Sequence, residues 1–270
     1  MSLKNLMVHL DQGERTQARL EIAVSLAHRY QARLLGVFGQ RAQAHQVGII
    51  VTWPSKEYTA AAAASKDAFE KATAGLADAE WHDINRGSDH ELLRQITDLA
   101  RYSDLMILGQ HDESAKSHVP AELAEEVVVN SGRPVLLVPY AGNFEADFRR
   151  PLIAWNKSRE AAHAVNDALQ LIEGCQEVTV VSLDTRRDDA KAACAEITRH
   201  LACHGIKAAT EVLVVEDVGV MDMLLNQVSD RGADLLVMGA HGQLGFPFVS
   251  RGAGTHYILR HMTVPVLMSN

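Results

Sequence analysis

The 270-residue sequence has few aromatic residues, few cysteines and no long apolar run. Its three cysteines (Cys175, Cys194 and Cys203) are odd in number and too few for a disulfide scaffold, which favours a reducing compartment. No apolar run approaches the roughly 18 residues that span a bilayer. The first residues lead straight into a strand pattern, without the apolar region of a signal peptide. We therefore expect a cytoplasmic protein with no membrane partner.

Basic charge is also in deficit. The 26 Lys and Arg residues against 34 Asp and Glu residues give a formal net charge of −8. A nucleic-acid-binding protein would concentrate basic charge on one face, so this balance argues against a nucleic-acid partner. Hydrophobic residues make up 47% of the chain, which indicates a globular protein with one large or two modest domains.

The chain repeats itself once. The segment Ser103–Asp112 (SDLMILGQHD) is echoed by Ala233–Gly242 (ADLLVMGAHG), and each copy is followed by a helical stretch and a short Pro-led apolar run. The openings at 6–11 and 152–156 also match. We predict a tandem duplication with domains at 1–140 and 151–270. The stretch between them has no clear period and is interpreted as a linker.

Short apolar strands alternate with helices in both copies. The first copy predicts strands at 3–10, 33–38, 80–84, 104–108 and 134–138, with helices at 14–30, 58–78, 89–101 and 121–131. The second predicts strands at 151–155, 177–183, 208–215, 234–238 and 264–268, with helices at 158–172, 188–204, 219–231 and 252–261. This pattern predicts the α/β class: two tandem five-stranded, mostly parallel, doubly wound domains. Ligands of such sheets bind at the carboxyl ends of the strands, near the switch point.

A glycine-rich segment follows the fourth strand of the second copy. Gly239, His241 and Gly242 lie just past the strand, while Gly252 opens the last helix and Thr255 follows as a cap or a hydroxyl donor to an anion. Glycines permit close approach of the backbone to a ligand, and a helix N-terminus attracts anions. With Arg251, His256 and Arg260 nearby, the segment describes a phosphate cradle. The alternative is an ordinary glycine-rich turn before a capped helix, because isolated glycine motifs are weak signals.

The spacing Gly239-x2-Gly242-x9-Gly252, together with the ending Ile258–Leu267, resembles the universal stress protein family. The resemblance covers the whole chain as two tandem units of the adenine-nucleotide alpha-hydrolase-like fold, related by a pseudo-twofold axis. It implies ATP or a related nucleotide, with Mg²⁺ as a candidate cofactor. The adenine is expected near the ends of the first two strands and the phosphates on the glycine loop.

Two positions of the second copy depart from the family pattern. Ala253 stands where the family has Ser or Thr, with Thr255 two residues later. Asn156 stands where the family has an Asp at the end of the first strand, and an amide still donates and accepts hydrogen bonds. The candidate nucleotide-binding residues are Asn156, Gly239, His241, Gly242, Gly252, Ala253 and Thr255.

The first copy keeps the strand-end acid as Asp11 but has lost the glycine loop, because Asp112 replaces the second glycine. Four further acids (Glu113, Glu122, Glu125 and Glu126) are predicted to crowd the phosphate position. Like charges there disfavour a triphosphate, so we expect the first copy not to bind ATP in the family manner.

Weaker signals surround these motifs. Ser158 is typical of a helix N-cap, and Lys157 or Arg159 could reach a phosphate. His200 and His204, with Cys203 between them, have metal-compatible spacing, although a helix end also favours histidine. We assign no catalytic residues and no metal site.

Two structural expectations remain. Residues 39–57 form an unusually long connection, interpreted as a lid, a partner surface or packing against the second copy. The family resemblance implies that the fifth strands, 134–138 and 265–268, are edge strands that pair with each other, which would hide their edges and leave homodimerisation open.

Two functions therefore stand. The first is a stress-response protein that binds ATP or a related nucleotide in the second domain, with at most slow ATPase activity. The second is a non-nucleotide adaptor that binds a protein or an apolar ligand through the two-domain shell and the 39–57 segment.

Overall fold

The computed structural model describes residues 3–42, 45–47, 50–52, 54–84, 88–113, 117–184, 186–214, 219–242 and 252–270, with only the backbone of 45–47, 50–52 and 183. The chain divides by its contacts into two compact units. Along the sequence, the boundary falls between Arg133 and Pro134. We call them the N-terminal unit (through Arg133) and the C-terminal unit (134–270). None of the helices that the structure describes combines the length and apolar character needed to cross a bilayer.

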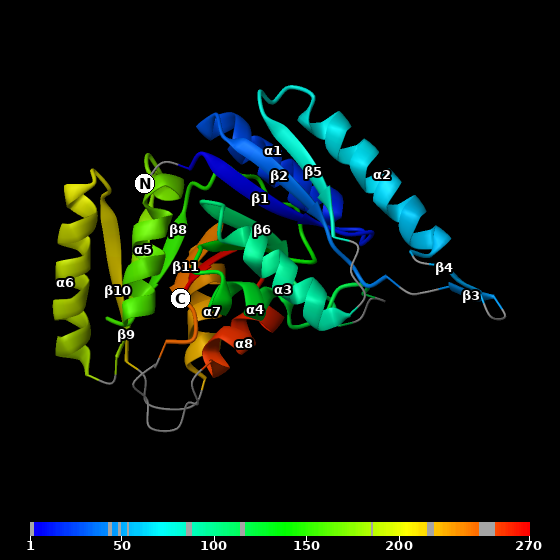
Figure 1. Ribbon diagram of the computed structural model, residues 1–270. Coiled ribbons are helices and arrows are strands. Elements are labelled where there is room, and N and C mark those ends of the chain that lie inside the picture. Colours follow the sequence, from blue (N-terminus) through cyan, green and yellow to red (C-terminus); the bar gives the residue numbers. More distant parts are fainter. Residues whose placement is uncertain are drawn as a thin grey trace. The chain divides into compact units, whose positions relative to one another are not determined.

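The N-terminal unit is built on parallel strands in the order β5-β2-β1-β6. Its strands are β1 (Asn5–Leu10), β2 (Arg33–Phe38), β3 (His45–Val47), β4 (Ile50–Thr52), β5 (Ala79–Asp83) and β6 (Leu105–Gly109). Its helices are α1 (Thr16–Tyr30), α2 (Lys56–Thr73), α3 (Asp89–Ala100) and α4 (Leu123–Asn130). Helices α1 and α2 pack together, as do α3 and α4, and the two pairs cover the sheet (Figure 1).

The C-terminal unit has the strand order β10-β9-β8-β11-β12-β7. Its strands are β7 (Val135–Val138), β8 (Pro151–Trp155), β9 (Val178–Asp184), β10 (Ala208–Val214), β11 (Leu235–Gly239) and β12 (Val266–Ser269). Its helices are α5 (Arg159–Ile172), α6 (Arg187–Cys203), α7 (Val220–Asp230) and α8 (Ala253–His261). All described pairings are parallel except that of β7 with β12. The predicted α/β class with mostly parallel strands is confirmed.

The predicted pairing of the two fifth strands is confirmed. Strand β7 lies antiparallel to β12, with Leu136 opposite Leu267 and Val135 opposite Met268. This pairing places β7 in the C-terminal unit, so the compact units meet upstream of the predicted 140–150 linker. That stretch contains neither helix nor strand, yet Phe148 within it is buried. Apart from the β3–β4 hairpin, each repeat has five described strands: β1, β2, β5, β6 and β7 in the first, and β8 to β12 in the second.

Two expectations within the first repeat need correction. Helix α2 begins at Lys56 rather than 58, because the Ser55 hydroxyl accepts the Tyr58 N–H at 3.2 Å and caps the helix. The helix also ends at Thr73, before Gly75. The 39–57 connection is not wholly irregular, because β3 and β4 form a separate antiparallel hairpin within it (Figure 1). Residues 43–44, 48–49 and 53 lie outside the described residues.

The repeated Ser/Ala-Asp motif has the same structural role in both units. The Asp104 carboxylate accepts the N–H groups of Lys4 and Asn5, at 2.8 and 2.9 Å. The Asp234 carboxylate accepts those of Arg149 and Arg150, at 2.7 and 2.9 Å. In each unit the aspartate before the fourth strand therefore anchors the backbone that leads into the first strand.

Replacing Asp234 with Ala should lower the free energy of unfolding by about 1–3 kcal/mol, because two backbone N–H groups lose a charged acceptor. Urea denaturation measures the change. The matched control is Asp230→Ala at the exposed end of α7, which should change stability by less than about 0.5 kcal/mol. Equal losses in both variants would contradict the anchoring role.

Candidate functional site

The candidate site lies where β8 and β11 run side by side in the centre of the C-terminal sheet. From β8 the chain proceeds through α5 to β9 on one side, while β11 borders β8 on the other. This is the switch point of a doubly wound sheet, and its carboxyl edge is where ligands of such sheets bind. Asn156 follows β8, and Ala240 and His241 follow β11.

The turn after β8 is held by its own side chains. The Asn156 Oδ1 atom accepts the Ser158 N–H at 3.1 Å, and the Ser158 hydroxyl accepts the Ala161 N–H at 3.1 Å. Ser158 is thus the N-cap of α5, as predicted. Between them Lys157 has a left-handed backbone with φ of 63°. The amide of Asn156 therefore shapes the turn from which Lys157 projects.

Lys157 forms an ion pair with the end of the neighbouring strand. Its ammonium lies 2.6 Å from the Asp184 carboxylate at the end of β9. The Lys157 side chain is about half exposed and that of Asp184 is mostly buried. A partly exposed pair of this kind is worth little stability, so Lys157 can exchange one anionic partner for another at low cost.

The glycines after β11 allow α5 to approach the strand end. A Cβ on Gly239 would overlap the Ala161 backbone nitrogen and lie 2.8 Å from the Glu160 Cβ. A Cβ on Gly242 would lie 3.1 Å from Glu160 Oε2 and 3.3 Å from the Ser158 hydroxyl. These two glycines therefore serve close packing by the first turn of α5.

The start of α8 completes the site. Gly252 is the N-cap of this helix with φ of +86°, and a Cβ there would lie 2.8 Å from the His241 imidazole. Thr255 is not the cap, because its buried hydroxyl accepts the His241 N–H at 2.8 Å. Ala253, the first residue of the helix, is exposed.

Most of the predicted nucleotide-binding residues are thus brought together at one strand edge. Contacts link Asn156 to Ser158, Ser158 to Gly242, and His241 to both Gly252 and Thr255. Residues 243–251, including the predicted Arg251, lie outside the described residues. In the parts of the chain that the structure describes, no three His, Cys, Asp or Glu side chains are arranged to hold a metal ion.

Sequence reasoning missed Glu160, the second residue of α5. It is only 7% exposed, and its carboxylate lies between the start of α5 and Gly242. One oxygen accepts the Arg159 guanidinium at 3.1 Å. The signal was available, because an acid two residues after an N-cap faces the helix N-terminus.

The equivalent edge of the N-terminal unit can be found from strand register. Leu6 lies opposite Leu105 in β1 and β6, as Pro151 lies opposite Leu235 in β8 and β11. Counting forward from these pairs makes Asp11 the counterpart of Asn156, and Gly109 the counterpart of Gly239. Asp11 and Gly109 thus occupy the edge where the first repeat would hold a ligand.

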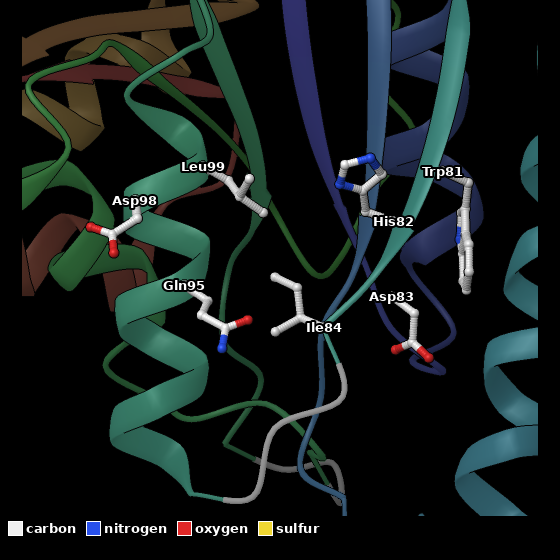
Figure 2. A pocket seen from close by; sticks show the side chains of 7 residues that line it. All are labelled: Trp81, His82, Asp83, Ile84, Gln95, Asp98 and Leu99. Atoms are coloured by element: carbon white, nitrogen blue, oxygen red, sulfur yellow. The ribbon is translucent and has the colours of Figure 1, made fainter.

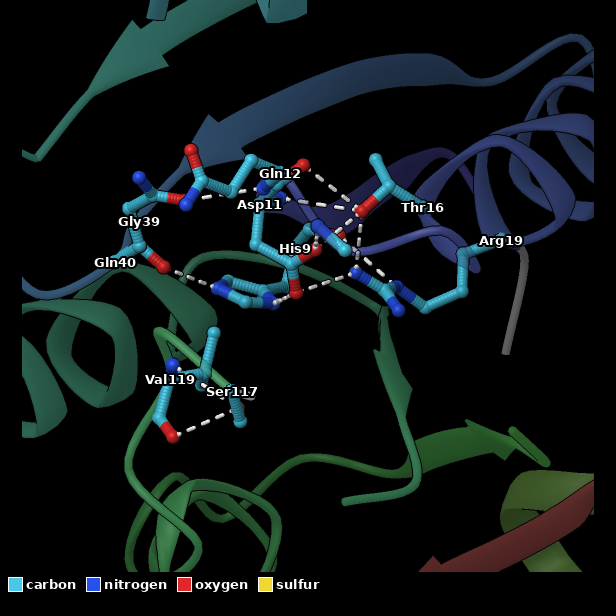
Figure 3. A network of polar contacts seen from close by, with 10 residues as sticks. His9, Asp11, Gln12, Thr16, Arg19, Gly39, Gln40, Ser117 and Val119 are labelled. Atoms are coloured by element: carbon cyan, nitrogen blue, oxygen red, sulfur yellow. Dashed lines mark hydrogen bonds and ion pairs between the residues drawn. The ribbon is translucent and has the colours of Figure 1, made fainter. Parts of the chain in front are cut away.

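An arginine of the same unit lies at that edge. Arg19 reaches from α1 and donates to Asp11 Oδ2 at 2.9 Å and to the Thr16 hydroxyl at 3.0 Å (Figure 3). Its side chain is 5% exposed. A Cβ on Gly109 would overlap the Arg19 guanidinium, so the arginine occupies the space against the end of β6. The corresponding position in α5, eight residues after Asn156, is the buried Ala164.

The network sets the charge of its members. Burial opposes ionisation of Asp11, but Arg19, His9 and hydrogen bonds from Thr16 and Gly13 outweigh it and hold the Asp11 pKa well below its usual range. Burial lowers the pKa of His9 to about 4, against the opposing attraction of Asp11. His9 is therefore neutral near pH 7, and its Nε2–H donates to the Gly39 carbonyl at 2.7 Å.

The predicted acidic crowding in the first copy stays a prediction. Of the four acids, Glu126 lines a groove of about 430 Å³ between α3 and α4, with His90 and Arg94. At the strand edge itself the structure shows the Asp11–Arg19 ion pair, packed against Gly109.

Another cavity, of about 520 Å³, lies between the edge strand β5 and α3. In Figure 2, His82 and Ile84 from the β5 side face Gln95 and Leu99 of α3, while Trp81 and Asp83 lie toward α2. The Asp83 carboxylate is occupied by the Tyr58 hydroxyl at 2.5 Å. At the end of α6, His200 and the C-cap residue His204 form an edge-to-face ring contact, with centroids 5.0 Å apart.

A sequence model described as the universal stress protein family matches residues 155–270. This match confirms the predicted family resemblance for that segment. No curated protein sequence matches the chain.

Solved structures show the same fold over the whole chain. A universal stress protein from Archaeoglobus fulgidus DSM 4304 gives a TM-score of 0.71 at 16% identity, covering 100% of this chain and 99% of that one. A protein assigned to the same family from Pseudomonas aeruginosa UCBPP-PA14 gives 0.62 at 15% identity, covering 99% and 93%. A protein of unknown function from Pseudomonas aeruginosa PAO1 gives 0.59 at 15% identity, covering 99% and 92%. The likeness in fold extends across both repeats.

Replacing His9 with Gln should flatten the pH dependence of stability between pH 6.5 and 4. The folded-state pKa of about 4 lies below the ordinary histidine pKa of 6.5, so His9 of the unfolded chain binds the proton first as the pH falls. The wild-type chain should lose roughly 3 kcal/mol across this window through His9 alone. Urea denaturation at several pH values measures the slope. The control is His28→Gln, a change at an exposed histidine, which should keep the wild-type slope. A wild-type slope in His9→Gln would contradict the lowered pKa of His9.

Replacing Arg19 with Ala should cost about 3–5 kcal/mol, because Asp11 would stay buried without its counter-ion. The double variant Asp11→Asn with Arg19→Ala copies the residues of the C-terminal unit and should lose less than the sum of the single changes, with a coupling of about 1–3 kcal/mol. A double-mutant cycle by denaturation measures this. Strict additivity would show that the two side chains act independently.

Proposed function

We propose that the C-terminal unit binds ATP or a related adenine nucleotide, with little or no turnover, because residues 155–270 match the model of the universal stress protein family. The proposed site is the carboxyl edge of β8 and β11, bounded by the β8–α5 turn and the start of α8. At the N-terminal edge Arg19 already pairs with the strand-end acid Asp11, and we propose no nucleotide site there.

The contact between the start of α8 and the turn after β11 carries the proposal. Gly252 packs on His241, so the N-terminus of a nine-residue helix lies at the switch point of the sheet. Among the described contacts, no side chain caps this helix. Its first N–H groups and its dipole favour an anion, which suits the phosphates of a nucleotide.

The surrounding side chains supply recognition rather than chemistry. The Asn156 amide retains an N–H₂ donor while its oxygen holds Ser158. Lys157 offers a cation that can move from Asp184 to a phosphate. The Thr255 hydroxyl accepts from His241 and keeps its own proton as a donor. Each of these groups would bind or orient a nucleotide.

The β3–β4 hairpin favours a second candidate function. It forms its own two-stranded sheet within the 39–57 segment and is not a strand pair of the main sheet. Two-stranded hairpins are marginally stable alone, so a protein partner that adds contacts would stabilise it. An adaptor role through this hairpin would become the better reading if no nucleotide binds to the chain.

Replacing Gly242 with Asp should abolish nucleotide binding. The Cβ of the new side chain would lie 3.1 Å from Glu160 Oε2. Its carboxylate would therefore add a second negative charge beside Glu160, where the phosphates are proposed to bind. The matched control is Gly242→Asn, which adds the same bulk without charge and should retain more affinity. Calorimetric titration of the full chain with ATP and Mg²⁺, after extraction of co-purified nucleotide, measures both.

Saturation at one nucleotide per chain would agree with a single competent unit. A Gly242→Asp variant that binds ATP with the parent affinity would show that the phosphate position is wrongly assigned. Saturation at two per chain would show that Arg19 does not close the N-terminal edge.

A further inference from the structure

Glu160 places a buried carboxylate in the site proposed for phosphates. The residue is 7% exposed, and its Oε2 atom is the nearest atom to the space beside Gly242, at 3.1 Å from a Cβ built there. The backbone around Glu160 also fills the space against Gly239. The side chain therefore lies against both glycines of the turn that follows β11.

The neighbours of Glu160 neutralise it only in part. Its Oε1 atom accepts the Arg159 guanidinium, but that arginine side chain is 68% exposed and therefore well screened by water. The N-terminal dipole of α5 also favours a carboxylate at this position. These interactions explain why Glu160 is tolerated in the folded protein, but they leave Oε2 directed toward the glycine turn.

The charge at this position is reversed between the repeats. Glu160 lies four residues after Asn156, and the residue four after Asp11 is Arg15. The N-terminal unit therefore combines an acid at the strand end with a base at the start of the helix. The C-terminal unit has a neutral amide at the strand end and an acid at the helix start.

A free nucleotide in this site would bring its phosphates against a carboxylate, which repels them. A divalent cation removes the conflict, because Mg²⁺ prefers oxygen ligands and is held by one or two carboxylates together with the phosphates of its nucleotide. The donor set fits such an ion, since the available group is a carboxylate oxygen.

We propose that Glu160 makes the C-terminal site selective for the complex of a divalent cation with a nucleotide over the free nucleotide, by directing its carboxylate at the cation. This inference rests on the proposed nucleotide function and adds the cation requirement to it. In the complex the cation supplies charge neutralisation, while Glu160 holds it and the start of α8 faces the phosphates.

The test is calorimetric titration of the full chain with ATP, once with MgCl₂ and once with EDTA. The wild-type chain should bind ATP at least roughly tenfold more tightly with Mg²⁺. Glu160→Gln keeps the shape of the side chain and removes its charge. It should bring the ratio of the two affinities close to one, chiefly by tightening the binding of metal-free ATP.

The matched control is Glu173→Gln, an exposed acid just past the end of α5, which should keep the wild-type ratio. A thermal unfolding midpoint for each variant checks folding, and Glu160→Ala serves as the second variant if Glu160→Gln does not fold. Bound Mn²⁺ provides a separate readout, because its paramagnetic resonance spectrum with ATP should change in Glu160→Gln and not in Glu173→Gln.

The outcomes separate the two proposals. Equal affinity of the wild-type chain with and without Mg²⁺, or a Glu160→Gln variant that keeps the wild-type ratio, would overturn the role of Glu160 and leave the nucleotide function standing. No binding of ATP in either condition would overturn the nucleotide function, and the cation requirement with it.

Discussion

The close approach of the first helix of each repeat to the end of its fourth strand is the constraint on which both strand edges depend. In the C-terminal unit the first turn of α5 lies directly against Gly239, where a Cβ would overlap the Ala161 backbone. In the N-terminal unit the same place, Gly109, is covered by the Arg19 guanidinium from α1. A glycine is needed in both, but one packs against backbone and the other against a charged side chain.

This difference explains why several residues change together between the repeats. Asp11 retains its charge at the strand end, and burial of that charge requires a counter-ion, which Arg19 supplies at 2.9 Å. Asn156 is neutral, and its side-chain oxygen accepts a hydrogen bond from the Ser158 N–H within the turn. The C-terminal repeat therefore needs no arginine counter-ion, and Ala164 stands at the equivalent place. The first edge thus contains an internal ion pair, and the second has two neutral residues at the equivalent places.

Much of the fold could be predicted from the sequence because its signals are local or repeated. The apolar runs of β6 and β11 and the Ser158 cap follow from patterns that one segment carries. The pairing of β7 with β12 is expected from the family resemblance instead. The sequence repeat shows that Asp104 and Asp234 are equivalent. It does not show that their carboxylates accept backbone N–H groups at the start of β1 and just before β8.

The charges inside the two edges could not be predicted in the same way. Arg19 lies on a helix whose pattern does not distinguish a buried arginine from one that reaches solvent, and only the distance to Asp11 reveals its role. Glu160 likewise resembles an ordinary acid in the first turn of a helix. Its proximity to Gly242 comes from a segment more than 80 positions later in the chain, which no local pattern reports.

The electrostatic consequence differs for the two edges. An edge that contains a matched acid and base gains nothing from an anionic ligand, because binding would require Asp11 and Arg19 to separate within a buried space. An edge that contains a carboxylate beside an uncapped helix N-terminus has an attraction and a repulsion for the same phosphates. A cation carried by the phosphates turns the repulsion into an attraction without moving the helix. Under the proposed function, the duplicated fold would thereby combine one edge that contains its own ion pair with one whose selectivity depends on the charge of the ligand.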